Sequence, residues 1–237
     1  MDYPFIKNCS LFAGIPADEL RKILESAAQH VQYYEKGETV FHFMEPASRI
    51  GIIMEGKIRS VKPFPNGSLV DVASRLPGDM IGPAAVFSAN RQYPCDVVAD
   101  EPSTIMMFQK EDILALLQTD VRILENFTRE LATAAYMLQE RLELLSYHGI
   151  AQKAAFYLML QKRKSGRDTV QIPRSISNWA LVLDVSRPSL HRELKKMEAA
   201  GIIRCNAHSI SILDEDSLNR IILHLPPESA ETSRQTL

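Results

Sequence analysis

The sequence has few cysteines, a single tryptophan and no long hydrophobic run. Its three cysteines, Cys9, Cys95 and Cys205, lie more than 80 residues apart and form no CxxC pair. This spacing excludes a zinc knuckle and a clustered iron–sulfur ligand run, and it predicts free thiols. No apolar run approaches the roughly 18 residues that cross a bilayer. The first residues, MDYPFIKNCS, lack the basic start and apolar stretch of a signal peptide, so we expect a cytoplasmic protein without a membrane partner.

The rest of the composition is ordinary for a globular protein. Hydrophobic residues make up 46% of the chain and charged residues 24%, which excludes disorder, collagen and a coiled-coil fibre. A chain of 237 residues forms one large domain or two small ones. The motifs GxSxG, HExxH and SxxK are absent, and we predict no enzymatic activity.

Short apolar segments fill the region from Val31 to Phe108. Turn residues separate them, including Lys36-Gly37, Glu55-Gly56 and Pro65-Asn66-Gly67. Many short strands at even spacing are typical of an antiparallel sandwich or barrel. The expected strands are Thr39–Phe43, Gly51–Met54, Ile58–Val61, Leu69–Val72, Asp96–Ala99 and Thr104–Phe108.

From Lys110 onward the pattern becomes helical. We expect Gly149 to end a long helix, because glycine commonly follows a helix C-terminus. Two short strands, Ile202–Arg204 and Ser209–Leu213, are predicted to form a hairpin, and residues 224–237 are expected to be disordered. The expected helices are 111–118, 121–147, 150–163, 176–183, 187–200 and 214–223.

The long predicted helix carries an apolar seam. Every seventh residue is leucine from position 124 to position 145, and such a heptad predicts a coiled-coil contact between two chains. The alternative is a helix that packs on its own domain. The predicted homodimer residues are Leu124, Phe127, Leu131, Leu138 and Leu145.

Charge is distributed unevenly along the chain. Residues 149–213 hold 11 lysines and arginines against 4 acidic residues, a net charge of +7. Residues 1–148 carry −6 and residues 214–237 carry −3. A basic helical module beside an acidic strand-rich one is typical of a nucleic-acid reader with a separate sensor. The alternative is a solvated basic surface.

Residues 177–201 have the pattern of a helix-turn-helix. The first helix is predicted to bury Trp179, Leu183 and either Leu181 or Val182, with the small Ala180 at the close approach of the helices. Asp184-Val185 is the predicted turn. Ser186 is the predicted N-cap of the second helix, and Pro188 sits in its first turn. Leu190, Leu194 and Met197 fall at i, i+4 and i+7 and form the buried stripe.

The opposite face of this second helix is polar and basic. Arg187 and Arg192 are the predicted base readers, because a guanidinium can bind guanine O6 and N7 together. The hairpin Ile202–Leu213 would form a wing. The predicted DNA-binding residues are Ser175, Ser177, Ser186, Arg187, Ser189, His191, Arg192, Lys195 and Lys196.

On these motifs the sequence resembles the Crp/Fnr superfamily of bacterial transcription regulators. The resemblance covers residues 10–215 and is carried by Val185–Leu194, VSRPSLHREL, and by Pro77–Gly82, PGDMIG. It implies an α+β fold: an N-terminal double-stranded β-helix (jelly-roll, cNMP-binding-like) sensor domain, a long dimerisation helix and a C-terminal winged helix-turn-helix. The implied boundaries are 1–119 for the sensor, 120–148 for the dimer helix, 149–213 for the DNA-binding domain and 214–237 for a helix and tail.

The sequence departs from the cyclic-nucleotide binders of this family. They place a glutamate on the ribose where this chain has Pro83, and an Arg-Ser or Arg-Thr pair on the cyclic phosphate where it has Tyr93-Pro94. Their adenine-binding hydroxyls align with Ala134 and Ala135. Charge-assisted contacts are the strong ones, so we predict an effector other than cyclic AMP.

The remaining pocket is predicted to be apolar and to suit an unidentified organic ligand or haem. Its predicted lining is Ile81, Gly82, Pro83, Val86, Phe87, Tyr93, Cys95, Ala134, Ala135, Tyr136 and Leu138. An iron–sulfur cluster is not expected, because Cys9 stands alone near the N-terminus. Some regulators of the family are haem-dependent sensors of nitric oxide or carbon monoxide, and thiol sensing by the three cysteines is a further alternative. The candidate haem ligands are His30, His42, Cys95, Met80 and Met137; a metal site is not defined by the sequence.

The sequence thus predicts a homodimeric regulator that binds a near-palindromic operator in double-stranded DNA. The family resemblance adds RNA polymerase as a partner. The alternative, from another class, is a ligand-binding signalling module whose helical half binds a protein. The +7 charge of residues 149–213 favours DNA over that alternative.

Overall fold

The computed structural model describes residues 8–63 and 69–225, and the chain divides into two compact units, Met1–Ala135 and Tyr136–Leu237. The predicted turn Pro65-Asn66-Gly67 and nearly all of the predicted tail lie outside the described residues. Among the helices described, none has the length and apolar character needed to cross a membrane. Each unit has its own hydrophobic core.

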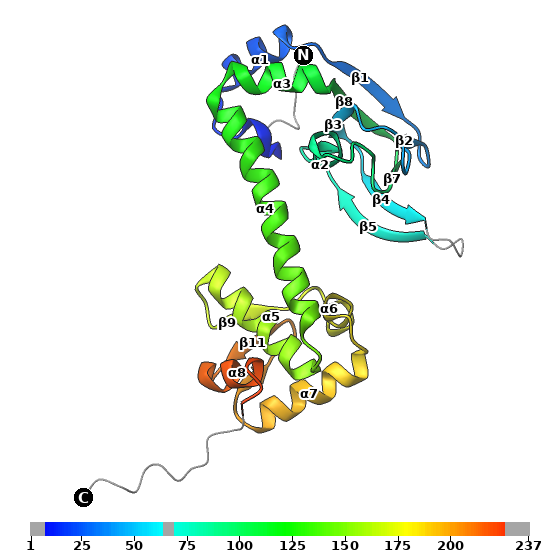
Figure 1. Ribbon diagram of the computed structural model, residues 1–237. Helices are drawn as coiled ribbons and strands as arrows, with labels where there is room; N and C mark the ends of the chain where they lie inside the picture. The colour runs from blue at the N-terminus through cyan, green and yellow to red at the C-terminus, as the bar shows by residue number, and fades with distance from the viewer. Residues whose placement is uncertain (1–7, 64–68, 226–237) are drawn as a thin grey trace, which may run out of the picture. The chain divides into compact units, whose positions relative to one another are not determined.

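The first unit contains two four-stranded antiparallel sheets (Figure 1). One sheet has the order β1-β8-β3-β6 and the other the order β2-β7-β4-β5. The strands of the first sheet are β1 (His30–Tyr34), β8 (Ser103–Gln109), β3 (Arg49–Glu55) and β6 (Met80–Ile81). The strands of the second are β2 (Thr39–Phe41), β7 (Asp96–Ala99), β4 (Ile58–Pro63) and β5 (Leu69–Arg75).

Strand β3 lies at the centre of this core. Ile50, Ile52 and Ile53 are completely buried, so the strand lacks the alternation of a half-exposed one. Gly51 lets neighbouring side chains approach its backbone: a Cβ there would lie 2.7 Å from the Ile105 side chain and 2.9 Å from that of Ile81. The glycine is therefore required by close packing.

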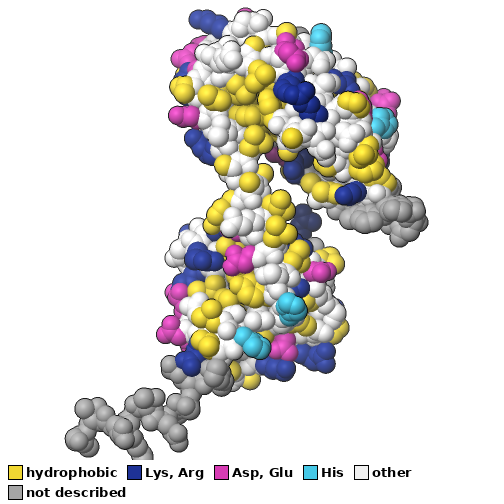
Figure 2. All heavy atoms as spheres, viewed as in Figure 1, with side chains coloured by type: hydrophobic (Ala, Val, Ile, Leu, Met, Phe, Trp, Pro, Cys, Tyr) yellow, Lys and Arg dark blue, Asp and Glu magenta, His cyan; other side chains and the backbone are white. Residues whose placement is uncertain are grey.

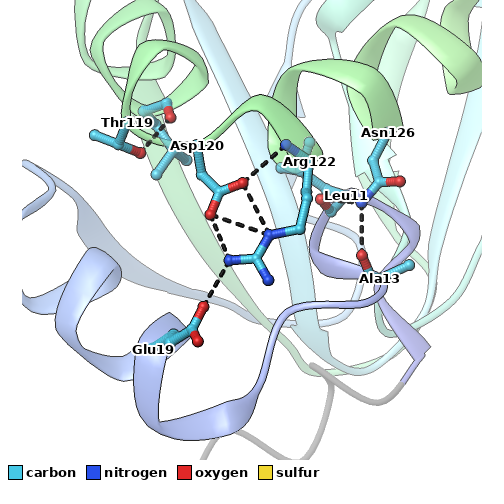
Figure 3. A network of polar contacts seen from close by, with 8 residues as sticks. Leu11, Ala13, Glu19, Thr119, Asp120, Arg122 and Asn126 are labelled. Carbon is cyan, nitrogen blue, oxygen red and sulfur yellow. Dashed lines mark hydrogen bonds and ion pairs between the residues drawn. The ribbon is translucent and has the colours of Figure 1, made fainter.

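The helices of the first unit are α1 (Ala17–Ser26), α2 (Pro83–Phe87), α3 (Lys110–Thr119) and the first part of α4 (Val121–Ser146). A polar network ties α4 to the N-terminal segment (Figure 3). Arg122 forms ion pairs with Glu19 and Asp120, each at 2.6 Å. The buried Asn126 donates hydrogen bonds to the carbonyls of Leu11 and Ala13, at 3.1 and 2.9 Å.

The second unit packs α5 (Ile150–Ser165), α6 (Ile176–Leu183), α7 (Arg187–Ala199) and α8 (Glu215–Ile222) around one core. A three-stranded antiparallel sheet has the order β10-β11-β9. Its strands are β9 (Thr169–Gln171), β10 (Ile203–Cys205) and β11 (Ser209–Ile212).

The predicted fold class is confirmed: a strand-rich N-terminal domain, one long helix and a C-terminal helix-turn-helix. Gly149 was assigned wrongly. Helix α4 ends at Ser146, and Gly149 is the extended N-cap residue of α5, where its N–H donates to Gln152 Oε1 at 3.1 Å. Strands β1, β6 and β9 and helix α2 were not predicted.

Replacement of Asn126 by alanine should lower the free energy of unfolding. The carbonyls of the buried Leu11 and the exposed Ala13 would lose their donor, which costs about 1–3 kcal/mol. Chemical denaturation followed by circular dichroism measures the change. Thr128→Ala is the control, because this exposed hydroxyl bonds only the Leu124 carbonyl of its own helix. Equal values for the two variants would contradict the anchoring role of Asn126.

Candidate functional site

The turn between α6 and α7 fixes the geometry of the basic module. Asp184 ends α6 in the left-handed conformation, with φ 53°. Its N–H donates to the Leu181 carbonyl at 3.2 Å, and the Val185 N–H donates to the Ala180 carbonyl at 3.0 Å. Aspartate adopts this conformation more readily than most residues. The predicted turn is therefore present without glycine.

The two helices bury the predicted apolar residues. Trp179, Leu183 and Leu190 are completely buried. The choice between Leu181 and Val182 is resolved: Leu181 is 75% exposed, whereas Val182 is half-buried and its carbonyl accepts a hydrogen bond from Arg141. Burial of this stripe leaves the polar side of α7 facing outward.

The outward side of α7 is basic. Arg187, His191 and Lys195 follow each other at four-residue spacing and form one line along the helix. Arg192 and Lys196 lie beside that line, and all five side chains are exposed. These side chains can reach a polyanion.

Serine hydroxyls hold the start of each helix. Ser186 Oγ accepts from the Ser189 N–H at 3.2 Å and donates to Ser189 Oγ at 2.8 Å. Ser189 Oγ also accepts from Arg192 Nη2 at 3.3 Å. Ser175 caps α6 in the same way by accepting from the Asn178 N–H at 3.2 Å, while Ser177 is exposed. Ser175 and Ser186 thus serve as helix caps as well as candidate phosphate contacts.

The two predicted phosphate-binding lysines form surface ion pairs. Lys195 Nζ lies 2.8 Å from Glu198 Oε2, and Lys196 Nζ lies 2.8 Å from Glu193 Oε1. The hydrogen bond to Glu198 raises the pKa of Lys195. Because exposed pairs contribute little stability, both lysines can exchange a carboxylate for a phosphate at low cost.

The wing carries basic residues that sequence reasoning missed. Arg204 on β10 and His208 in the β10–β11 turn are both exposed. The Cys205 N–H donates to Glu198 Oε1 at 2.8 Å and joins the wing to α7. The alternation Ile-Arg-Cys at 203–205 was the available signal for an outward Arg204.

In the first unit, Tyr93 stands where the cyclic-nucleotide binders are expected to have an arginine on the cyclic phosphate. Its side chain forms an aromatic stack instead. The Tyr93 ring stacks on Phe41 with centroids 4.2 Å apart and planes at 4°. Tyr93 OH donates to the Arg49 carbonyl at 2.6 Å and accepts from the Arg49 N–H at 3.2 Å. Burial raises the pKa of Tyr93. Gly82, with φ +86°, leaves room for this stack: a Cβ would lie 3.2 Å from either ring.

The other predicted pocket residues are spread over several environments. Ile81 and Cys95 are buried, Pro83 and Phe87 are half-buried, and Ala134, Ala135 and Leu138 are exposed on α4. Phe87 makes an edge-to-face contact with Phe127, at a centroid distance of 5.4 Å. Tyr93 belongs to the core of the first unit and is 2% exposed.

The candidate haem ligands lie on different elements. His30 and His42 are exposed, Met80 and Cys95 are buried, and Met137 is 60% exposed on α4. Within the described part of the chain, no group of three or more His, Cys, Asp or Glu residues could hold a metal ion. Burial raises the pKa of the Cys9 thiol to about 12, so its reactive thiolate is scarce at neutral pH.

An open groove of about 450 Å³ was not anticipated from the sequence. It lies against β1 and β2. Its lining is Gln32, Tyr33, Tyr34, Thr39, Val40, His42, Glu45 and Arg49, which includes only His42 of the predicted ligand residues.

The predicted seam of α4 divides into two parts. Phe127 is 5% exposed and Leu131 half-buried, and both pack in the core of the first unit. This part of the helix follows the alternative of packing on its own domain. Hydrophobic side chains are visible along α4 in the space-filling view (Figure 2). The exposed ones are Val121, Leu124, Tyr136, Met137, Leu138, Leu142 and Leu145.

Two family models match the chain. The cyclic nucleotide-binding domain matches residues 31–120, and the Crp-like helix-turn-helix domain matches residues 152–221. Together they account for about two thirds of the sequence. The chain belongs to the Crp/Fnr family of transcription regulators.

Curated relatives agree with the Crp/Fnr assignment. The nitrogen fixation regulation protein FixK of Bradyrhizobium diazoefficiens is 25% identical over 88% of each chain. The transcriptional activatory protein AadR of Rhodopseudomonas palustris is 26% identical over 84% of this chain and 82% of its own length. The cyclic AMP receptor protein of Thermus thermophilus is 21% identical over 93% of this chain and all of its own. These relatives are regulators rather than enzymes.

Solved structures share the Crp/Fnr fold. An OCPA-complexed CprK has a TM-score of 0.59 at 19% identity, covering 87% of this chain and 94% of its own. A mutant of CooA from Carboxydothermus hydrogenoformans has a TM-score of 0.57 at 14% identity, covering 94% and 96%. Identities this low bear on the fold alone.

Two substitutions at Asp184 test whether the left-handed backbone of the turn limits which residue can stand there. Asp184→Gly should keep or raise the free energy of unfolding of the second unit, because glycine adopts a positive φ without strain. Asp184→Val should lower it by about 1–2 kcal/mol, because a β-branched residue is strained there. Denaturation followed by the fluorescence of Trp179, the single tryptophan, reports this unit directly. A more stable valine variant would contradict the strained turn.

Proposed function

We propose that this Crp/Fnr regulator binds a near-palindromic operator as a homodimer, under the control of an effector other than cyclic AMP. Two copies of α7 would enter successive major grooves about 34 Å apart. The observation that supports this most directly is the exposed basic face of α7, held by the Ser186 cap and the buried stripe beneath it.

Within that face the residues have different proposed roles. Arg187 and Arg192 read bases, because their guanidinium groups are exposed and can bind guanine in two places. Ser175, Ser177, Lys195 and Lys196 contact phosphates and set the position of the helix. Pro188 replaces a glutamate that is common in the family, so the half-site sequence of relatives does not transfer to this chain.

The proposed dimer uses the exposed part of the α4 seam. Leu138 and Leu142 are each 61% exposed, and Leu145 is 39% exposed. Together with the exposed Leu124, these side chains would be buried by a second copy of α4. Burial of this apolar surface would drive association.

The proposed effector is a small molecule that biases two arrangements of the dimer. Such coupling is linkage between the effector site and the DNA site. Tyr93 supports the exclusion of cyclic AMP, because its ring is packed on Phe41 and carries no positive charge for a phosphate. The haem-dependent sensor and contact with RNA polymerase stay predictions.

Replacement of Arg192 by alanine should weaken specific DNA binding by about tenfold or more, because one bidentate base contact contributes about 1–3 kcal/mol. Affinity for random duplex should change little. The measurement is a titration of both duplexes, the specific one selected from a random library. Lys196→Ala is the comparison: it should weaken both duplexes alike and reduce the salt slope by about one. Equal losses on both duplexes for Arg192→Ala would refute base reading.

Replacement of Leu138 by glutamate should dissociate the dimer. A charge in the seam costs roughly 3 kcal/mol or more, which weakens association at least about a hundredfold. Light scattering over a concentration series gives the dissociation constant. Gln139→Glu adds the same charge at the neighbouring exposed position, outside the heptad of Leu138, and should leave the dimer intact. A dimeric Leu138→Glu variant would overturn the proposed interface.

A further inference from the structure

The outward face of α7 has an apolar side chain at its centre. Pro188 and Arg192 each precede a buried leucine, Leu190 or Leu194, by two residues. At about 100° per residue, two residues turn a helix by roughly 200°, so both side chains point away from the buried stripe. They are four residues apart and therefore neighbours on the helix surface, and both are exposed. Pro188 thus lies next to Arg192, where α7 faces away from its own core.

Pro188 offers a partner only carbon atoms. Its ring carries no hydrogen-bonding group, and proline has no backbone N–H to donate. It stands in the first turn of α7, where N–H groups have no acceptor within the helix, so the start of the helix loses no hydrogen bond. The fold therefore tolerates proline at this position, and the exposed ring is open to a partner.

The polar neighbours of Pro188 are donors rather than carboxylates. Both acidic residues of α7 are half-buried and form ion pairs with lysines of the same helix. Arg192 Nη2 instead donates to Ser189 Oγ at 3.3 Å, and Ser189 Oγ also accepts from Ser186 Oγ at 2.8 Å. The guanidinium is thus held toward the first turn of the helix, the turn that contains Pro188.

The four bases differ in what they present to such a side chain in the major groove. Thymine alone has an apolar group there, its 5-methyl group. Cytosine presents its N4 amino group, which would lose water against a carbon surface without gaining an acceptor. Guanine and adenine present polar atoms as well. A side chain made only of carbon therefore favours thymine.

We propose that Pro188 is a specificity-determining residue, whose ring packs on the 5-methyl group of a thymine in each half-site. Neighbours on one helix face are about 5–6 Å apart, and successive base pairs are about 3.4 Å apart. The thymine therefore lies one or two base pairs from the guanine that Arg192 reads. This inference deepens the proposed function and rests on it for the position of α7 in the major groove.

Uracil substitution tests the contact, because uracil differs from thymine only by the missing methyl group. A duplex is first selected from a random library with the full-length protein. The guanine read by Arg192 is the base whose substitution no longer matters in Arg192→Ala. Each thymine within two base pairs of it is then replaced by uracil in both half-sites. One of these replacements should weaken binding of the wild-type protein about threefold or more per half-site, as expected for one buried methyl group.

Pro188→Gln should abolish this uracil penalty, which is the ratio of the affinities for the thymine and uracil duplexes. Because the ratio is taken within one variant, an overall loss of affinity or stability does not enter it. The matched control is Ala199→Gln, which places the same side chain at an exposed position nearer the C-terminus of α7 and should keep the full penalty. Pro188→Glu should prefer cytosine to thymine at this position, since a carboxylate accepts from cytosine N4.

The outcomes separate this inference from the proposed function. If the wild-type protein binds the thymine and uracil duplexes alike, or if Pro188→Gln shows an equal penalty, Pro188 serves only the start of the helix and the inference is wrong. The selected sequence and its dependence on Arg192 then still support the proposed function. A protein that selects no sequence loses the proposed function, and this inference with it.

Discussion

Burial of one stripe of α7 is the constraint on which the basic module depends. Leu190, Leu194 and Met197 are at most 4% exposed and lie in the same core as Trp179. A helix that buries this stripe must turn its arginines and lysines toward solvent. The left-handed Asp184 supplies the change of chain direction that makes this burial compatible with α6. Core packing therefore determines which side chains can meet a polyanion.

A second constraint shapes the sensor. Tyr93 fills its position with a ring stacked on Phe41, and its hydroxyl binds both backbone polar groups of Arg49. Because both the ring and the hydroxyl of Tyr93 contact the rest of the fold, this side chain has no free polar group for a charged ligand.

Sequence reasoning predicted some elements well for physical reasons. Helix α6 has its predicted bounds, 176–183, because the Ser175 cap and the Asp184 turn are both local. Strand β1 was missed because nearly all of His30–Tyr34 is exposed, so it lacks the alternation of a half-buried strand. The outward Leu181 and the inward Tyr93 depend on long-range packing, which a single sequence does not encode locally.

The first and the later part of helix α4 differ in burial, and this difference bears on how effector binding in the sensor could affect the proposed dimer. Its first turns are held by Asn126 and by Phe127 within the core of the first unit. Its later apolar residues, from Tyr136 to Leu145, are mostly exposed. A dimer built on that exposed part would bury only a short apolar seam. A short seam contributes a small free energy of association. In the proposed dimer, a ligand in the sensor would shift the populations of two arrangements only as far as its affinity for the two arrangements differs.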